Sequence, residues 1–187
     1  NIIDGLLSDE SNTVIKMKVA NTKELLNYIN EGAIDFALVE GYFNKLEYDF
    51  LHYCQERYVC VASSDFKLDH VDDISDLFKY NLLIREVGSG SREIIERYLG
   101  DRNLNVNDFT NLIEISNINT IKQLVKNNHG ISFMYKIAVE KEMNSGLLKE
   151  IDIAGLSIEH DINFVWRKNS VFIDYYQQLF KLFFEYR

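Results

Sequence analysis

The stretch YNLLIREVGSGSREIIERYL, residues 80–99, joins three segments of different character. Residues 81–84 form an apolar run typical of a buried strand, and residues 91–99 repeat apolar side chains at helical spacing. Two glycines and two serines, at positions 88–91, separate the two segments. A strand that leads through a glycine-rich loop into a helix is typical of an α/β protein.

The same alternation of strands and helices extends along the chain in both directions. We expect strands at residues 15–19, 34–39, 46–54, 57–62, 81–85, 110–115, 130–134, 147–153 and 161–167. We expect helices between Asn21 and Gly32 and at residues 91–99, 117–127, 135–144 and 170–186. This alternation favours parallel sheets with both faces covered. A polar break at residues 63–65 separates two such runs, which predicts two α/β lobes.

The composition indicates a folded, acidic chain. Of the 187 residues, 47% are hydrophobic and 26% are charged, and the formal net charge is −9. This charge argues against direct binding of nucleic acid, which needs lysine and arginine opposite the phosphates. No apolar stretch is long enough to span a bilayer and no signal peptide is evident, so we expect a cytoplasmic chain without a membrane partner.

The cysteines and histidines give no sign of a metal site. Cys54 and Cys60 lie in apolar surroundings, where buried, reduced thiols are the simplest expectation. The four histidines lack the spacing of metal ligands; they are His52, His70, His129 and His160. We therefore expect no metal and no other cofactor.

Polar residues gather where predicted strands lead into helices. Ligands of open α/β sheets bind beyond the carboxyl ends of the strands, so these junctions are candidate binding sites. Helix capping by serine, threonine or asparagine is the alternative explanation at each junction, and it stays open. The loop at 88–91 exceeds what a cap requires, because its two glycines let backbone N–H groups approach an anion closely.

Known catalytic motifs do not match this loop. A nucleophile elbow requires G-x-S-x-G, and a phosphate-binding P-loop requires a Lys-Ser or Lys-Thr pair that is missing after Gly90. A dinucleotide fingerprint requires a third glycine where Glu93 stands. No histidine lies in the junctions to activate a hydroxyl nucleophile. We therefore do not expect an enzyme.

Four stretches resemble, in order and spacing, the effector-binding domain of LysR-type transcriptional regulators. They are GAIDFALVEG (32–41), LLIREVGSGSREIIERYL (82–99), EISNINTIKQLVKNNHGISFMYKIAVEKEMNSGLLKEIDI (114–153) and NFVWRKNSVFIDYYQQLFKLFFEY (163–186). Tyr135 departs from the proline that this family usually carries there. The sequence also starts inside the family's first helix, so we expect that a preceding strand and an effector-contacting loop are missing from it.

The resemblance implies an α/β fold of the periplasmic-binding-protein type II kind, with two Rossmann-like lobes joined by two crossover segments. Lobe I would comprise 1–63 plus 161–187, and lobe II 64–160, with the effector in the cleft between them. The family's effector contacts would fall on the junctions named above. These residues are Asn21, Thr22, Glu40, Gly88, Ser89, Gly90, Ser91, Ser116, Asn117 and Asn119.

The resemblance further implies a sensor of a small anionic or amino-acid-like effector that controls transcription through DNA. Contact with DNA would belong to an N-terminal winged helix-turn-helix absent from these residues. Glu40 beside an N–H-rich loop fits a zwitterionic ligand, with a solvated or Arg-paired Glu40 as the alternative. A free-standing solute-binding protein of a transport system is the alternative function.

Self-association is a further expectation from the resemblance. The family implies a homodimer, with a tetramer for the full-length protein. Candidate interface residues are Ile2, Ile3, Leu6, Leu7, Ile137 and Val139.

Overall fold

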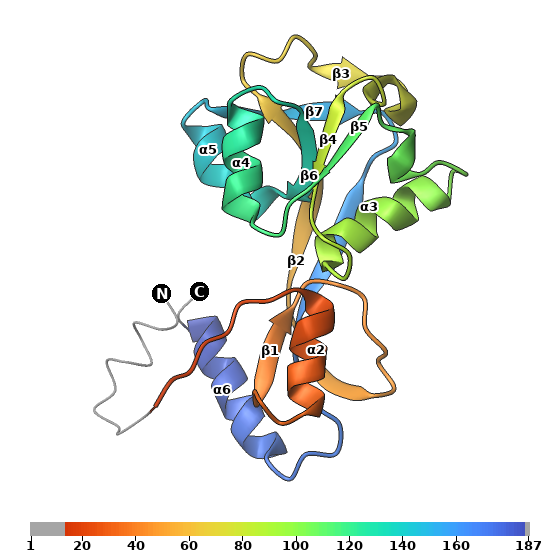
Figure 1. The fold of residues 1–187 in the computed structure, drawn as a ribbon. Coiled ribbons are helices and arrows are strands. Elements are labelled where there is room, and N and C mark those ends of the chain that lie inside the picture. The colour runs from red at the N-terminus through yellow and green to blue at the C-terminus, as the bar shows by residue number, and fades with distance from the viewer. Residues whose placement is uncertain (1–13, 186–187) are drawn as a thin grey trace. The chain divides into compact units, whose positions relative to one another are not determined.

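The computed structural model describes residues 14–185, which form two compact units (Figure 1). Unit 1 extends to Cys54 and resumes at Ile162, and unit 2 spans Gln55–Asp161. The expected lobes, 1–63 plus 161–187 and 64–160, differ from these units mainly at the first boundary. That boundary lies inside a long strand, β2 (Tyr48–Ser63), rather than after it.

Unit 1 packs helices on the two faces of a small antiparallel sheet. Strand β1 (Phe36–Val39) pairs with β8 (Ile158–Arg167), with Phe36 opposite Trp166. Helix α2 (Thr22–Asn30) contributes Ile29 to one core cluster, which includes Val165. Side chains of α6 (Ile173–Glu185) pack with Phe164 and Trp166 in a second, aromatic cluster. Neighbouring residues of β8 thus serve opposite faces, as the two-residue period of a strand requires.

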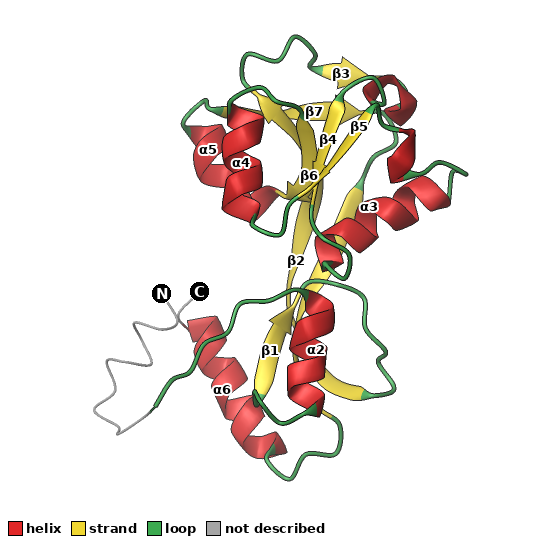
Figure 2. Ribbon diagram, viewed as in Figure 1, coloured by secondary structure: helices red, strands yellow, loops and turns green. Residues whose placement is uncertain are grey.

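Unit 2 has a mixed sheet flanked by helices (Figure 2). Strand β4 (Asn81–Ile84) pairs in parallel with β5 (Asn111–Glu114) and with β6 (Ile131–Tyr135). Strand β2 pairs antiparallel with β6 and with β7 (Leu148–Ile153), and β7 pairs in parallel with β3 (His70–Val71). The helices are α3 (Gly90–Gly100), α4 (Ile118–Lys126) and α5 (Glu140–Asn144), with 3-10 turns at Ile74–Leu77, Val106–Asp108 and Lys136–Ala138.

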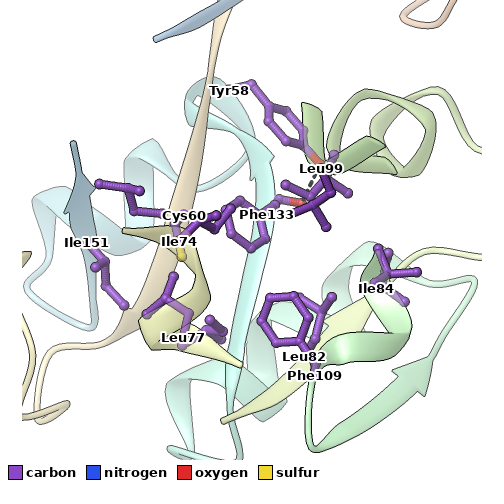
Figure 3. Close-up of a cluster of buried hydrophobic side chains, with 14 of the residues drawn as sticks. Tyr58, Cys60, Ile74, Leu77, Leu82, Ile84, Leu99, Phe109, Phe133 and Ile151 are labelled. Atoms are coloured by element: carbon purple, nitrogen blue, oxygen red, sulfur yellow. Dashed lines mark hydrogen bonds between the residues drawn. The ribbon is translucent and has the colours of Figure 1, made fainter. Parts of the chain in front are cut away.

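The apolar run of β4 faces two cores. Leu82 packs in a cluster with Leu99 of α3, and Leu83 packs in a separate cluster with Val125 of α4. Figure 3 shows the first cluster, in which Tyr58 and Cys60 of β2 lie with Phe133 of β6. A strand buried on both faces needs a continuous apolar sequence, which is what residues 82–84 provide.

Both cysteines are buried and free, as expected. Cys60 is fully buried, and burial, with a smaller contribution from the nearby Glu150 carboxylate, raises the pKa of its thiol. The protonated form therefore dominates at neutral pH.

Two strand predictions differ from the structure. The predicted strand at 15–19 is wrong: residues 14–20 have no regular structure, and the Met17 and Val19 side chains are exposed. A strand needs a neighbour for its N–H and C=O groups, and no described strand pairs with this segment. The strands predicted at 46–54 and 57–62 are one continuous strand, β2.

The expected parallel sheet and one helix also need correction. The sheet is mixed, because β2 runs antiparallel to both β6 and β7. The helix predicted at 135–144 is divided, since Tyr135 belongs to β6 and Val139 (φ −122°, ψ 4°) interrupts the turns that follow. Val139 is fully buried, so core packing overrides helix continuity there.

Gly130 allows β6 to approach β4, and we expect Gly130→Ala to destabilise the chain. A Cβ at this position would collide with the Asn81 carbonyl oxygen and would come within 2.7 Å of Leu83 Cδ1. We expect a loss of about 2 kcal/mol in the free energy of unfolding, measured in urea.

Gly100→Ala is the matched control. No atom lies within 4 Å of a Cβ at the end of α3, so this change should stabilise by about 0.5 kcal/mol. Equal effects of the two substitutions would contradict the role assigned to Gly130.

His70 of β3 should titrate above its ordinary range. Its Nδ1 lies 2.6 Å from Asp152 Oδ2 of β7 and its Nε2 lies 3.2 Å from Asp72 Oδ1. The hydrogen bond to Asp152, followed by that to Asp72, raises the pKa of His70 above 6.5. Its stabilising contribution is therefore complete below pH 6.5 and is lost as the pH rises through the raised pKa.

An NMR titration of the His70 imidazole would test this expectation. The pKa should fall toward 6.5 in Asp152→Asn, and unfolding of His70→Gln should lose the corresponding pH dependence. A titration unchanged by Asp152→Asn would contradict it.

Candidate functional site

Seven of the ten predicted site residues lie at one edge of the unit 2 sheet. Because β4 and β5 are parallel with Ile84 opposite Glu114, their carboxyl ends lie side by side. The Ile115 N–H extends the pairing by donating to the Ile84 carbonyl at 2.9 Å. Each strand then leads into the N-terminus of a helix, α3 or α4 (Figure 1). We call residues 88–91 and 116–119 the loop pair.

The first loop of the pair is dense in hydrogen-bond donors. Gly88 has φ +95°, in the region that favours glycine, and Ser89 is the N-cap residue of α3. The Ser89 hydroxyl does not cap the helix; its Oγ lies 3.0 Å from Ser91 Oγ, and both side chains are buried. The first N–H groups of a helix lack intrahelical partners and favour an anion.

A side chain of β2 anchors the first loop of the pair. The Tyr58 hydroxyl donates to the Ser91 carbonyl at 2.5 Å and lies 3.1 Å from the Phe133 carbonyl of β6. Tyr58 thereby ties the start of α3 to two strands of the sheet. Its ring packs edge-on against that of Tyr135, the residue where the family pattern has proline.

The second loop of the pair is more exposed. Asn117 Oδ1 accepts a hydrogen bond from the Thr120 N–H at 3.0 Å, so this side chain caps α4. The capping interpretation therefore applies to Asn117, whose N–H donors remain compatible with a ligand. Ser116 and Asn119 are exposed at the same helix start.

The other three predicted residues lie in unit 1. Asn21 and Glu24 form the expected capping box, in which Asn21 Oδ1 accepts from the Glu24 N–H at 3.0 Å. Thr22 is buried at the first position of α2, and Glu40 is half-buried directly after β1. The start of α2 and the end of β1 lie at the same end of unit 1 (Figure 1).

Arg92 is a residue of this edge that the sequence analysis did not select. Its guanidinium donates to the Arg85 carbonyl and to the carboxylates of Glu96 and Glu114. Burial lowers the pKa of Arg92, but the bonds to both carboxylates outweigh it, and the net direction is upward. The sequence contained one signal for this role. Arg92 lies on the otherwise apolar face of the predicted helix, four residues before Glu96.

In the part of the chain that the structure describes, no group of three or more histidine, cysteine, aspartate or glutamate side chains could hold a metal ion. A cavity of about 70 Å³ in unit 2 is lined by residues 57–60, 150–153 and 156–159, and this lining does not include the loop pair. Between residues 14 and 185 no helix has the length and hydropathy to cross a membrane.

Comparison with known proteins identifies relatives among transcriptional regulators. The chain is 30% identical over 154 residues to the HTH-type transcriptional regulator CbbR of Rhodospirillum rubrum, which covers 82% of this chain and 50% of that protein. The chain spans about half the length of the curated relatives it matches. These relatives are regulators, and they give no support to the transport alternative.

Solved structures agree in fold. The regulatory domain of CcmR from Synechocystis PCC6803, in complex with 2-PG, aligns with a TM-score of 0.85 at 16% identity, covering 99% of this chain and 88% of that one. The effector binding domain of QuiR in complex with shikimate aligns with a TM-score of 0.76 at 19% identity, covering 99% and 88%. The fold is thus the two-lobed α/β type of periplasmic-binding-protein type II proteins.

A model of the LysR substrate binding domain matches residues 1–184, nearly the whole chain. Together with the regulators of similar sequence, this match shows that the chain belongs to the LysR substrate binding domain family.

Proposed function

We propose that this domain senses a small anionic or zwitterionic metabolite and thereby controls transcription. The observation that carries the proposal is the loop pair, where two parallel strands end level and each leads into a helix start rich in serine, glycine or asparagine. The family consists of transcriptional regulators rather than enzymes. Contact with DNA belongs to a helix-turn-helix domain outside these residues.

The chemistry of the loop pair suits an anion. Buried hydroxyls of Ser89 and Ser91 and the first N–H groups of α3 supply hydrogen-bond donors. Two structural relatives were solved in complex with small molecules, CcmR with 2-PG and QuiR with shikimate. Asn21, Thr22 and Glu40 remain predicted contacts of the same effector, a prediction that comes from the sequence.

The charge of Glu40 distinguishes two kinds of effector, a simple anion and a zwitterion. A carboxylate repels a simple anion, whereas it attracts the ammonium group of an amino acid. A zwitterion would direct its amine to Glu40 and its acid to the serines of the first loop. If Glu40 is instead neutralised within the protein, a simple anion becomes the better ligand.

The regulatory step follows from linkage. An effector shifts an equilibrium between two forms of the regulator only by its differential affinity for them. A coupling of 1–3 kcal/mol, roughly 5- to 150-fold, is ordinary for such proteins. We propose that this coupling passes to the DNA-binding domain in a cytoplasmic homodimer, or a tetramer of full-length chains.

The structure narrows the set of residues that are candidates for the dimer interface. Ile137 is 57% exposed and stays a candidate interface residue, whereas Val139 is buried in the unit 2 core and is excluded. Ile2, Ile3, Leu6 and Leu7 lie outside the described residues.

Thermal unfolding of the 187-residue chain against a ligand panel tests the function. The panel contains amino acids, keto acids, short carboxylates, sulfate, phosphate, 2-PG and shikimate. A ligand at 100 times its dissociation constant stabilises by about 2.7 kcal/mol and should raise the Tm by about 2–4 °C. Ser89→Ala and Ser91→Ala should abolish most of that shift.

Ser145→Ala provides the control, because this exposed serine ends α5 and bonds only its own helix through the Glu142 carbonyl. Its ligand shift should equal that of the parent chain. Glu40→Gln should weaken the binding of an amine-bearing ligand, whereas a simple anion should bind at least as tightly as to the parent chain. A panel in which no compound shifts the Tm, or a shift retained in both serine variants, would contradict the proposal.

A further inference from the structure

Arg92 joins three elements through one guanidinium. Its Nε donates to Glu96 Oε1 at 2.6 Å within α3. Its Nη1 donates to the Arg85 carbonyl, just after β4, at 3.1 Å. The same nitrogen donates to Glu114 Oε2, at the end of β5, at 2.5 Å.

Two of these partners, Arg85 and Glu114, lie in the segments that lead into the two loops of the pair. Arg85 opens the segment that leads through residues 88–91 into α3, and Glu114 immediately precedes the segment that leads into α4. The backbone pairing between β4 and β5 ends at Ile115. Beyond that residue, the Arg92 guanidinium sets the spacing between the two segments that lead into α3 and α4. Arginine suits this role because its donors have a rigid, forked geometry.

Burial makes the bridge costly to break. The Arg92 side chain is 10% exposed, whereas that of Glu114 is 50% exposed. A charge withdrawn from water needs paired acceptors, and Arg92 has two carboxylates and one carbonyl. Glu114 is half in solvent and can be rehydrated when its partner is lost. We therefore expect the loss of this pair to loosen the two loops locally.

We propose that Arg92 is the positioning residue of the loop pair. It fixes the spacing between residues 88–91 and residues 116–119 without itself contacting the effector. This inference rests on the proposed function, since it assigns the residue that preorganises the proposed site. Its Nε and Nη1 groups donate to protein acceptors on both sides of the loop pair, so we expect it to act through the loops. Preorganisation of this kind lowers the ordering cost of binding.

Hydrogen exchange of the ligand-free 187-residue chain tests the inference with Arg92→Lys. A lysine keeps the charge but replaces the fork with one ammonium group, so the contacts to Arg85, Glu96 and Glu114 cannot all form. We expect amides at 86–93 and at 115–120 to exchange roughly tenfold faster, the factor for one lost charged hydrogen bond. Amides of β6 should keep their protection.

Arg97→Lys is the matched control. Arg97 lies on the same helix and forms a similar forked pair with Glu93, at 2.7 Å and 3.1 Å, but its side chain is 56% exposed. Its exchange in both loops should match the parent chain. Glu114→Gln, which keeps an acceptor oxygen at a half-exposed position, should speed exchange in the same two segments by a smaller factor.

Three results would overturn the inference: unchanged exchange in both loops of Arg92→Lys, faster exchange spread evenly over β2, β4 and β6, or an equal effect of Arg97→Lys. Faster exchange distributed evenly over these strands would indicate that Arg92 stabilises the fold as a whole and does not specifically position the loops. Because this measurement needs no ligand, it can fail while the ligand panel succeeds, and the reverse.

Discussion

Parallel pairing of β4 with its two neighbours is the constraint on which the geometry of unit 2 depends. On one side the register places Ile84 opposite Glu114, so β4 and β5 end level and their helices start at one edge. On the other side Gly130 lets β6 approach the Asn81 backbone, which brings a third parallel strand beside them. A slip of one residue would turn Leu82 and Leu83 to the wrong cores, so the apolar pattern and the loop positions are determined together.

Both arginines at this edge are already paired with glutamates of the protein. Arg85 pairs with Glu86 at 2.8 Å, and Arg92 pairs with Glu96 and Glu114. An anion that binds here would therefore be held by hydroxyl and N–H groups rather than by an ion pair with either arginine. Such neutral donors recognise the shape of a small acid, and they make affinity less sensitive to salt than an arginine pair would.

The sequence predicted most elements because their signals are local. The capping residues Asn21 and Asn117, the apolar run of β4 and the faces of α3 and α4 all carry their pattern within a few residues. The strand expected at 15–19 failed because alternation alone supplies no partner, and the direction of β2 could not be read because antiparallel pairing with β6 is a long-range property. The candidate site divides in the same way. Gly88 and the two serines stood out locally, whereas Arg92 acquires its importance from Glu114, which is 22 positions away and close only in the fold.

Strand β2 has a consequence for how the chain folds. Its first half supplies Tyr48 and Tyr53 to the clusters of unit 1, and its second half supplies Val59 and Cys60 to those of unit 2. One continuous strand of 16 residues therefore carries side chains of all four hydrophobic clusters. Fraying of either unit removes order from a strand that the other unit needs. We therefore expect the unfolding of the two units to be coupled through the backbone of β2.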